Sequence, residues 1–159
     1  MKDTLLVYYS FEGNTAFAAK LLSGLMPMDV VRLKVKKEPP KTGLGKLLQG
    51  GKSALFQEDP GLFPVDVDIR DYYDINLAFP VWAGTYQPAI GAFLKANPFV
   101  QKNVYLVACS AGGDAKGAFD KLSRRLAGNT ILGTLSLKSP LKNRKETEAK
   151  IAEFAARRN

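Results

Sequence analysis

The sequence predicts a single α/β domain in which a parallel β-sheet is covered by helices on both faces. Apolar runs that suit buried strands alternate with segments whose apolar residues recur at helical spacing. Such alternation is typical of parallel sheets, because each helix crosses over a face between two strands. The length of 159 residues suits one domain with a sizeable core. The expected strands are residues 5–9, 29–35, 74–81, 103–109 and 130–137, and the later helices are residues 88–95, 115–126 and 143–157.

The stretch LLVYYSFEGNTAFAA, residues 5–19, predicts a strand, a tight turn and the start of a helix that reaches Leu25. The first amides of a helix lack intrahelical partners and lie at the positive end of the helix dipole. The hydroxyls of Ser10 and Thr15 and the amide of Asn14 fall at the same place. The turn is therefore suited to holding a phosphate without a basic side chain. The alternative is that Gly13 only turns the chain and Thr15 caps the helix.

The next segment predicts an edge strand followed by less regular chain. Residues 29–35 alternate apolar and charged side chains, which is typical of a strand, and two prolines after Glu38 stop it. Residues 41–57 have a partly helical pattern that Gly50 and Gly51 interrupt, so we expect a weak helix or a mobile flap. Residues 60–64 are expected to form a loop.

The third expected strand ends at Pro80, and a loop over residues 82–86 follows it. Pro88 then opens a helix, where its missing N–H is harmless. The fourth strand is followed by the small, polar loop 110–114. In the last helix, Ile151 and Phe154 lie on one face.

Three of these loops are expected to form the ligand site. In open parallel sheets, ligands bind outside the carboxyl ends of the strands, where the strand order reverses. The first, third and fourth strands all end in loops that are small, polar or aromatic. We therefore expect these three loops to cluster at one edge of the sheet.

Composition excludes several kinds of chemistry. The chain has no histidine, so the usual Ser-His and Cys-His catalytic arrangements and the usual zinc sites are not expected. One cysteine, Cys109, excludes an internal disulfide and fits a reducing compartment. No apolar run has the length of a membrane span, and no signal peptide is expected at the N-terminus. We expect a cytoplasmic protein whose chemistry belongs to a bound cofactor.

The net charge of +8 is unevenly distributed. A basic stretch holds Arg32, Lys34, Lys36, Lys37, Lys41, Lys46 and Lys52, and a second runs from residue 138 to residue 158. An acidic block holds Glu58, Asp59, Asp66, Asp68, Asp71 and Asp74. These charges either form an ordinary solvated surface or steer an acidic partner or an anionic ligand.

Two motifs carry a resemblance to the flavodoxin family. Residues 8–15, YYSFEGNT, resemble the family's phosphate loop, and residues 79–94, FPVWAGTYQPAIGAFL, resemble its second flavin loop. Residues 109–114, CSAGGD, fall where the third flavin loop is expected. The resemblance covers nearly the whole chain and is to the short-chain flavodoxins. It implies a flavodoxin-like three-layer sandwich, with a five-stranded parallel sheet in the order 2-1-3-4-5.

The resemblance also implies a site for flavin mononucleotide (FMN). The residues implied to bind it are Ser10, Phe11, Glu12, Gly13, Asn14, Thr15, Pro80, Val81, Trp82, Ala83, Gly84, Thr85, Ser110, Ala111, Gly112 and Gly113. Trp82 would lie against the isoalloxazine ring and Tyr86 would cover an edge or the other face. Gly84 would allow the backbone to approach the ring. Residues 110–113 would offer backbone groups to the pyrimidine side.

Each of these residues also has a simpler interpretation. Trp82 would plug the edge of the core, Gly84 would only form a turn, and Asp114 would cap a helix. Cys109 is better explained as a small buried hydrophobe than as a redox thiol. Glu12 departs from the family pattern, because it places a carboxylate where the family usually has Thr.

The resemblance favours an FMN-binding electron carrier between a reductase and an acceptor. An FMN-dependent NAD(P)H:quinone oxidoreductase of the same fold is the alternative. A flavin-free module that binds nucleic acid or anionic membrane is a third hypothesis, disfavoured because no aromatic platform interleaves the lysines. Typical flavodoxins are acidic and dock on basic partners, so this basic chain is expected to use other redox partner proteins, with acidic ones as candidates.

Overall fold

The computed structural model describes residues 2–38 and 59–158, so the weak helix or flap expected at residues 41–57 lies outside the described residues. The strands are β1 (Lys2–Tyr8), β2 (Asp29–Arg32), β3 (Tyr72–Trp82), β4 (Thr85–Tyr86), β5 (Asn103–Ser110) and β6 (Thr130–Lys138). The helices are α1 (Asn14–Leu25), the 3₁₀ helix η1 (Ile69–Asp71), α3 (Pro88–Ala96), α4 (Lys116–Arg125) and α5 (Arg144–Ala156).

The sheet has the flavodoxin-like topology that the sequence predicts. Five parallel strands run in the order β2-β1-β3-β5-β6, and the short β4 pairs antiparallel with β3. With β4 set aside, this is the predicted order 2-1-3-4-5. The order reverses between β1 and β3, so the carboxyl ends of these central strands form the expected ligand edge.

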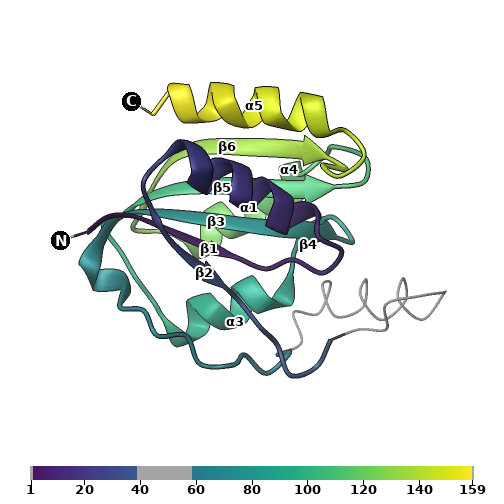
Figure 1. Ribbon diagram of the computed structural model, residues 1–159. Coiled ribbons are helices and arrows are strands. Elements are labelled where there is room, and N and C mark those ends of the chain that lie inside the picture. Colours follow the sequence, from purple (N-terminus) through teal and green to yellow (C-terminus); the bar gives the residue numbers. More distant parts are fainter. Residues whose placement is uncertain (1, 39–58, 159) are drawn as a thin grey trace.

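Helices cover both faces of the sheet, which gives the predicted three layers (Figure 1). One apolar cluster combines Leu6, Ala78 and Val107 of the sheet with side chains of α1 and α5. The other combines neighbouring sheet residues such as Leu77 and Phe79 with side chains of α3 and α4. Successive side chains of a strand belong to opposite clusters, because they alternate between the two faces of the sheet and helices cover both faces.

The predicted end of the third strand and the predicted loop after it are both wrong. The third strand does not end at Pro80 but continues to Trp82, and the expected loop at 82–86 contains β4. The ladder between β1 and β3 ends at the pair Tyr8–Ala78, so Pro80 has only β5 beside it. Proline is tolerated there because a strand with one neighbour needs no N–H on its other side.

The second strand is shorter than the predicted residues 29–35. Regular pairing with β1 ends at Arg32, although the N–H of Leu33 still donates to the carbonyl of Tyr8 at 2.7 Å. Beyond it, Val35 forms an isolated antiparallel bridge with Leu62. The alternating pattern continues past Arg32 because the chain stays extended there. Its pairing partner changes from β1 to the segment that contains Leu62.

A buried arginine fastens the C-terminal end of the chain to the sheet. The Arg158 side chain is 4% exposed and lies 3.5 Å above the Tyr105 ring. Its Nη1 donates to Oδ1 of the fully buried Asn76 at 2.7 Å, while the Asp74 carboxylate is 4.0 Å away. Burial lowers the pKa of Arg158, and Tyr105 and Asp74 oppose that shift.

Replacing Arg158 with Ala should lower the free energy of unfolding by about 2–3 kcal/mol, because Asn76 loses a charge-assisted hydrogen bond in a buried place. Urea unfolding followed by circular dichroism measures this change. Arg157→Ala is the matched control, because Arg157 is exposed and its ion pair within the described part of the chain is with the exposed Glu153. We expect the control to change stability by less than about 0.5 kcal/mol. Equal losses in both variants would contradict the assigned role of Arg158.

Candidate functional site

The first loop leads from β1 into α1 through a left-handed glycine. Gly13 precedes the helix with φ of +97°, and no side chain caps it. The Ser10 hydroxyl accepts the N–H of Ala16 at 3.0 Å. Thr15 lies inside the first turn, so the interpretation of Thr15 as the helix cap is wrong. The helix itself supplies no acceptor for the amides of Asn14 and Thr15.

Thr15 carries a polar atom that the fold leaves unsatisfied. Its side chain is 1% exposed, and Oγ1 makes no hydrogen bond of normal geometry among the described residues, although it lies close enough to the Cys109 thiol to lower the pKa of that thiol. A buried hydroxyl without a partner is rare in native structures and costs about 1–3 kcal/mol. Such a group in the first turn of a helix suits a bound anion.

The Asn14 side chain is already engaged, which the sequence did not predict. Its Oδ1 accepts the N–H of Leu141 at 2.9 Å and ties the start of α1 to the connection between β6 and α5. A Cβ on Gly13 would lie 3.4 Å from Cδ1 of Leu141, which is ordinary contact. Of the side chains expected to receive a phosphate, those of Ser10 and Thr15 therefore fit better than that of Asn14.

The second loop is a tight hairpin. Trp82 pairs with Thr85, and the two residues between them have positive φ, +49° at Ala83 and +70° at Gly84. Two successive positive φ values are typical of a type I′ turn, the turn that suits two-residue hairpins. Thr85 is buried, and Val81 pairs with Tyr86.

Trp82 joins the second loop to the first. Its ring meets Phe11 edge-on with 5.6 Å between ring centroids, and meets Tyr9 likewise at 6.3 Å. Tyr9 is 1% exposed and its hydroxyl has no partner among the described residues, so burial raises its pKa and keeps the phenol neutral. Two loops about 70 residues apart in the sequence thus share one aromatic cluster.

The structure adds Gly117, which the sequence analysis did not single out. A Cβ at Gly117 would lie 2.7 Å from the backbone oxygen of Gly84, closer than real Cβ atoms approach. The hairpin carbonyl therefore rests on the first turn of α4, in space that only a glycine leaves open. No local pattern indicates this, because the two residues meet only through the fold.

The third loop is folded on itself. The Ser110 hydroxyl accepts the N–H of Gly113 at 2.8 Å, and the carbonyl of Gly113 accepts the Ser136 hydroxyl at 2.5 Å. Gly113 has φ of +85°, whereas nothing lies within 4 Å of a Cβ built on Gly112. The loop is therefore held by one hydrogen bond of its own and one from β6, and among the described residues Gly112 faces open space.

A fourth connection, residues 139–143, belongs to the same edge. The N–H of Ser139 donates to the Ser110 carbonyl at 2.9 Å, and its hydroxyl donates to the Ala111 carbonyl at 3.4 Å. Through Leu141 the same connection also reaches the first loop. The sequence could indicate the place of residues 139–143 only through the predicted topology. Because β6 is parallel to β5, the two strands end at the same edge of the sheet.

Several simpler interpretations prove correct. The Asp114 carboxylate stabilises the start of α4 by accepting the N–H of Lys116 at 3.0 Å, although the N-cap position itself is held by Ala115. Burial raises the pKa of the Cys109 thiol to about 12, against the opposing effect of the Thr15 hydroxyl, so Cys109 stays a neutral thiol at physiological pH. Tyr86 is 5% exposed and its hydroxyl accepts a hydrogen bond from Arg125, so its side chain packs in the core. Glu12 is exposed.

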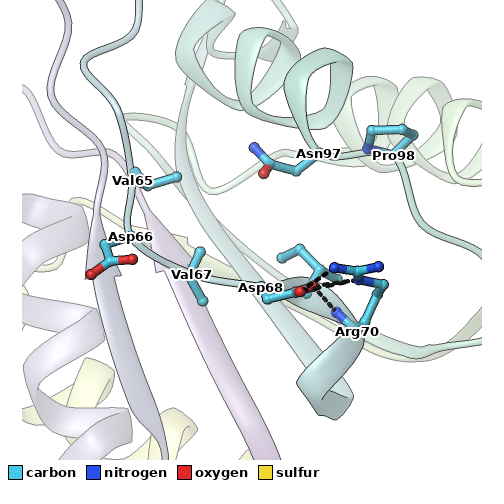
Figure 2. A pocket seen from close by; sticks show the side chains of 8 residues that line it. Val65, Asp66, Val67, Asp68, Arg70, Asn97 and Pro98 are labelled. Atoms are coloured by element: carbon cyan, nitrogen blue, oxygen red, sulfur yellow. Dashed lines mark hydrogen bonds and ion pairs between the residues drawn. The ribbon is translucent and has the colours of Figure 1, made fainter.

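A separate pocket of about 400 Å³ lies at the opposite, amino-terminal edge of β3 (Figure 2). Residues 65–70 with Asn97 and Pro98 line it. Its charged lining is largely self-satisfied, because Asp68 and Arg70 pair with each other at 2.6 Å. The hydrogen bond from Arg70 lowers the pKa of Asp68 to about 2. This open pocket lacks the convergent glycine-rich loops of the candidate site.

Within residues 2–38 and 59–158, no helix is both long enough and apolar enough to span a bilayer. The same residues contain no cluster of three or more metal-binding side chains of the His, Cys, Asp and Glu types.

Solved structures share this architecture. A flavoprotein from Lactobacillus acidophilus in complex with FMN aligns over 91% of this chain and 98% of its own, with 20% identity and a TM-score of 0.73. A Fusobacterium nucleatum flavodoxin bound to flavin mononucleotide aligns over 99% and 96%, with 14% identity and a TM-score of 0.61. Two-electron reduced Megasphaera elsdenii flavodoxin aligns over 97% and 98%, with 18% identity and a TM-score of 0.61.

No protein-family profile matches the sequence, and neither does any curated protein sequence. The structural likenesses, all at low identity, show that the chain has the flavodoxin-like fold.

Proposed function

We propose that this chain binds one FMN at the carboxyl edge of its sheet and carries electrons between a reductase and an acceptor. The observation that carries the proposal is the first turn of α1, where the amides of Asn14 and Thr15 have no intrahelical acceptor and the buried Oγ1 of Thr15 makes no hydrogen bond of normal geometry among the described residues. FMN in the Lactobacillus and Fusobacterium proteins of the same fold supports this choice of ligand.

The first loop fits the phosphate of FMN. The amides of Asn14 and Thr15 have no intrahelical acceptor, and the Thr15 hydroxyl adds a buried donor. Ser10 uses one lone pair to accept the N–H of Ala16, which leaves its own hydrogen to donate. Each hydrogen bond to a charged group contributes about 1.5–3 kcal/mol, so a few of them hold a phosphate without a basic side chain.

The second and third loops fit the ring system. Trp82 would lie against a ring face, while the turn at Ala83 and Gly84 and the loop from Ser110 to Gly113 would offer backbone groups to its edges. FMN, when bound, supplies reversible uptake of one or two electrons. The chain contributes binding, orientation and exclusion of water.

A titration of the purified apoprotein with FMN tests the proposal. We expect quenching of flavin fluorescence with one FMN bound per chain. Riboflavin is the matched control, because it keeps the ring and lacks the phosphate. We expect it to bind at least about a hundredfold more weakly, which corresponds to about 2.7 kcal/mol from the phosphate contacts.

Two results would contradict the proposal. Absence of quenching would exclude a flavin site, and equal affinities for FMN and riboflavin would exclude the first loop as its phosphate site. With the flavin loaded, rapid NAD(P)H oxidation in the presence of a quinone would favour the oxidoreductase alternative. The carrier is expected to need a separate reductase.

A further inference from the structure

Three cations form a row along one extended segment at the edge of the sheet. Arg32, Lys34 and Lys36, here called the basic row, are all exposed, whereas Leu33 and Val35 between them are buried. Successive side chains of an extended chain point to opposite sides. The three cations therefore face solvent together, with about 6.6–6.8 Å of chain between one and the next.

The backbone of the basic row is fixed on both sides. The N–H of Leu33 donates to the Tyr8 carbonyl at 2.7 Å, and the N–H of Lys36 donates to the Gly61 carbonyl at 2.7 Å. The Lys34 carbonyl accepts the N–H of Phe63 at 2.9 Å. A partner that binds here does not have to order the backbone, which lowers the entropic cost of association.

The charges of the basic row are not neutralised within the described parts of the chain. No carboxylate of residues 2–38 and 59–158 forms an ion pair with Arg32, Lys34 or Lys36. Two of the cations lie instead over aromatic rings, Arg32 at 5.9 Å from the centroid of Tyr8 and Lys36 at 5.5 Å from that of Phe63. Cation–π contact holds each head group in place and leaves its charge available.

The basic row begins beside the candidate flavin site. Arg32 ends β2 and pairs in register with Tyr8, two residues before Ser10. Tyr9, the neighbour of Tyr8, contacts Trp82 of the second loop. A molecule bound along the basic row therefore lies next to the edge at which electrons would leave or enter.

We propose that the basic row docks a protein partner through an extended acidic segment with Asp or Glu at alternate positions. Alternate side chains of such a segment repeat at the same interval as the cations, so three carboxylates can meet three cations in register. Nucleic acid is the less suitable occupant, because the rings that bases would stack on, Tyr8 and Phe63, already lie against cations. This inference rests on the proposed function only in taking the partner to be an electron donor or acceptor.

The test measures binding of a fluorescein-labelled peptide of alternating Glu and Ser to the purified protein, with and without added FMN, by anisotropy at several salt concentrations. The double variant K34Q/K36Q should weaken binding at least about tenfold and flatten its dependence on salt. The variant K121Q/K145Q is the matched control, because it removes the same net charge from exposed lysines of α4 and α5. We expect the control to weaken binding less than about twofold.

Equal losses in both double variants would overturn the proposal, since net charge alone would then explain the attraction. Tighter binding of single-stranded DNA of the same length, lost in K34Q/K36Q, would overturn the assignment to a protein partner. FMN affinity is measured on every sample and should be unchanged in both variants. If the wild-type chain binds peptide but no FMN, the proposed function fails while the docking surface stands.

Discussion

Replacing Gly13 with Asp should reduce FMN affinity by at least about a hundredfold in the fluorescence titration. The residue has φ of +97°, a conformation that strains most L-residues, and it immediately precedes the first turn of α1. A Cβ meets only Cδ1 of Leu141 at 3.4 Å, so the side chain fits without a severe clash. At a separation on the order of 5 Å, two unit charges of like sign repel by ~3 kcal/mol at an effective dielectric constant of about 20, so the new carboxylate would weaken the binding of a phosphate in this loop.

Gly13→Asn separates charge from backbone strain. Asn has nearly the same shape as Asp and tolerates the left-handed region comparably, so the two variants share the conformational cost. We expect Asn to weaken FMN binding by about tenfold or less and Asp to weaken it far more. Equal affinities of the two variants would mean that no phosphate lies near Gly13.

The strands were predictable from the sequence because each is an apolar run that ends in a turn, whereas their order in the sheet came from the resemblance to the flavodoxin family. A strand that helices cover on both faces, such as residues 103–109, is recognised by its continuous apolar run, without knowing which strand it pairs with. The ends were less predictable where tertiary pairing decides them. A proline at position 80 predicts the end of a strand. The structure shows that β1 stops beside Ala78, so the missing N–H of Pro80 costs no hydrogen bond to β1. Residues 33–35 read as strand because they remain extended after leaving the neighbouring strand.

The candidate site was predictable as three loops at one edge, and less so in its details. The turn at Gly13, followed two residues later by Thr15, predicts an anion site from the local sequence alone. That Asn14 is bonded to Leu141, 127 residues away, follows only from the docking of α1 beside α5. Nothing local in the sequence shows that the Tyr86 hydroxyl meets Arg125 across the fold.

Replacing Gly117 with Ala should weaken FMN binding by up to about a hundredfold. The added methyl group would lie 2.7 Å from the Gly84 oxygen, and this oxygen belongs to the backbone, so no side-chain rotation relieves the contact. Overpacking of this kind costs about 1–3 kcal/mol. In the free protein the exposed turn at Ala83 and Gly84 is able to move outward and avoid that cost. FMN binding would then require the turn to return against the methyl group.

Gly24→Ala controls for the general effect of replacing a helical glycine. Gly24 lies near the end of α1, and nothing is within 4 Å of its Cβ position. Alanine favours the helix over glycine by up to about 1 kcal/mol, so both variants gain local stability. We expect Gly24→Ala to raise the unfolding free energy slightly with FMN affinity unchanged, and Gly117→Ala to lose affinity. If Gly117→Ala behaves like Gly24→Ala in both measurements, α4 does not position the hairpin. Because helix propensity acts in the same direction in both variants, a loss of affinity confined to Gly117→Ala is assigned to the contact with Gly84.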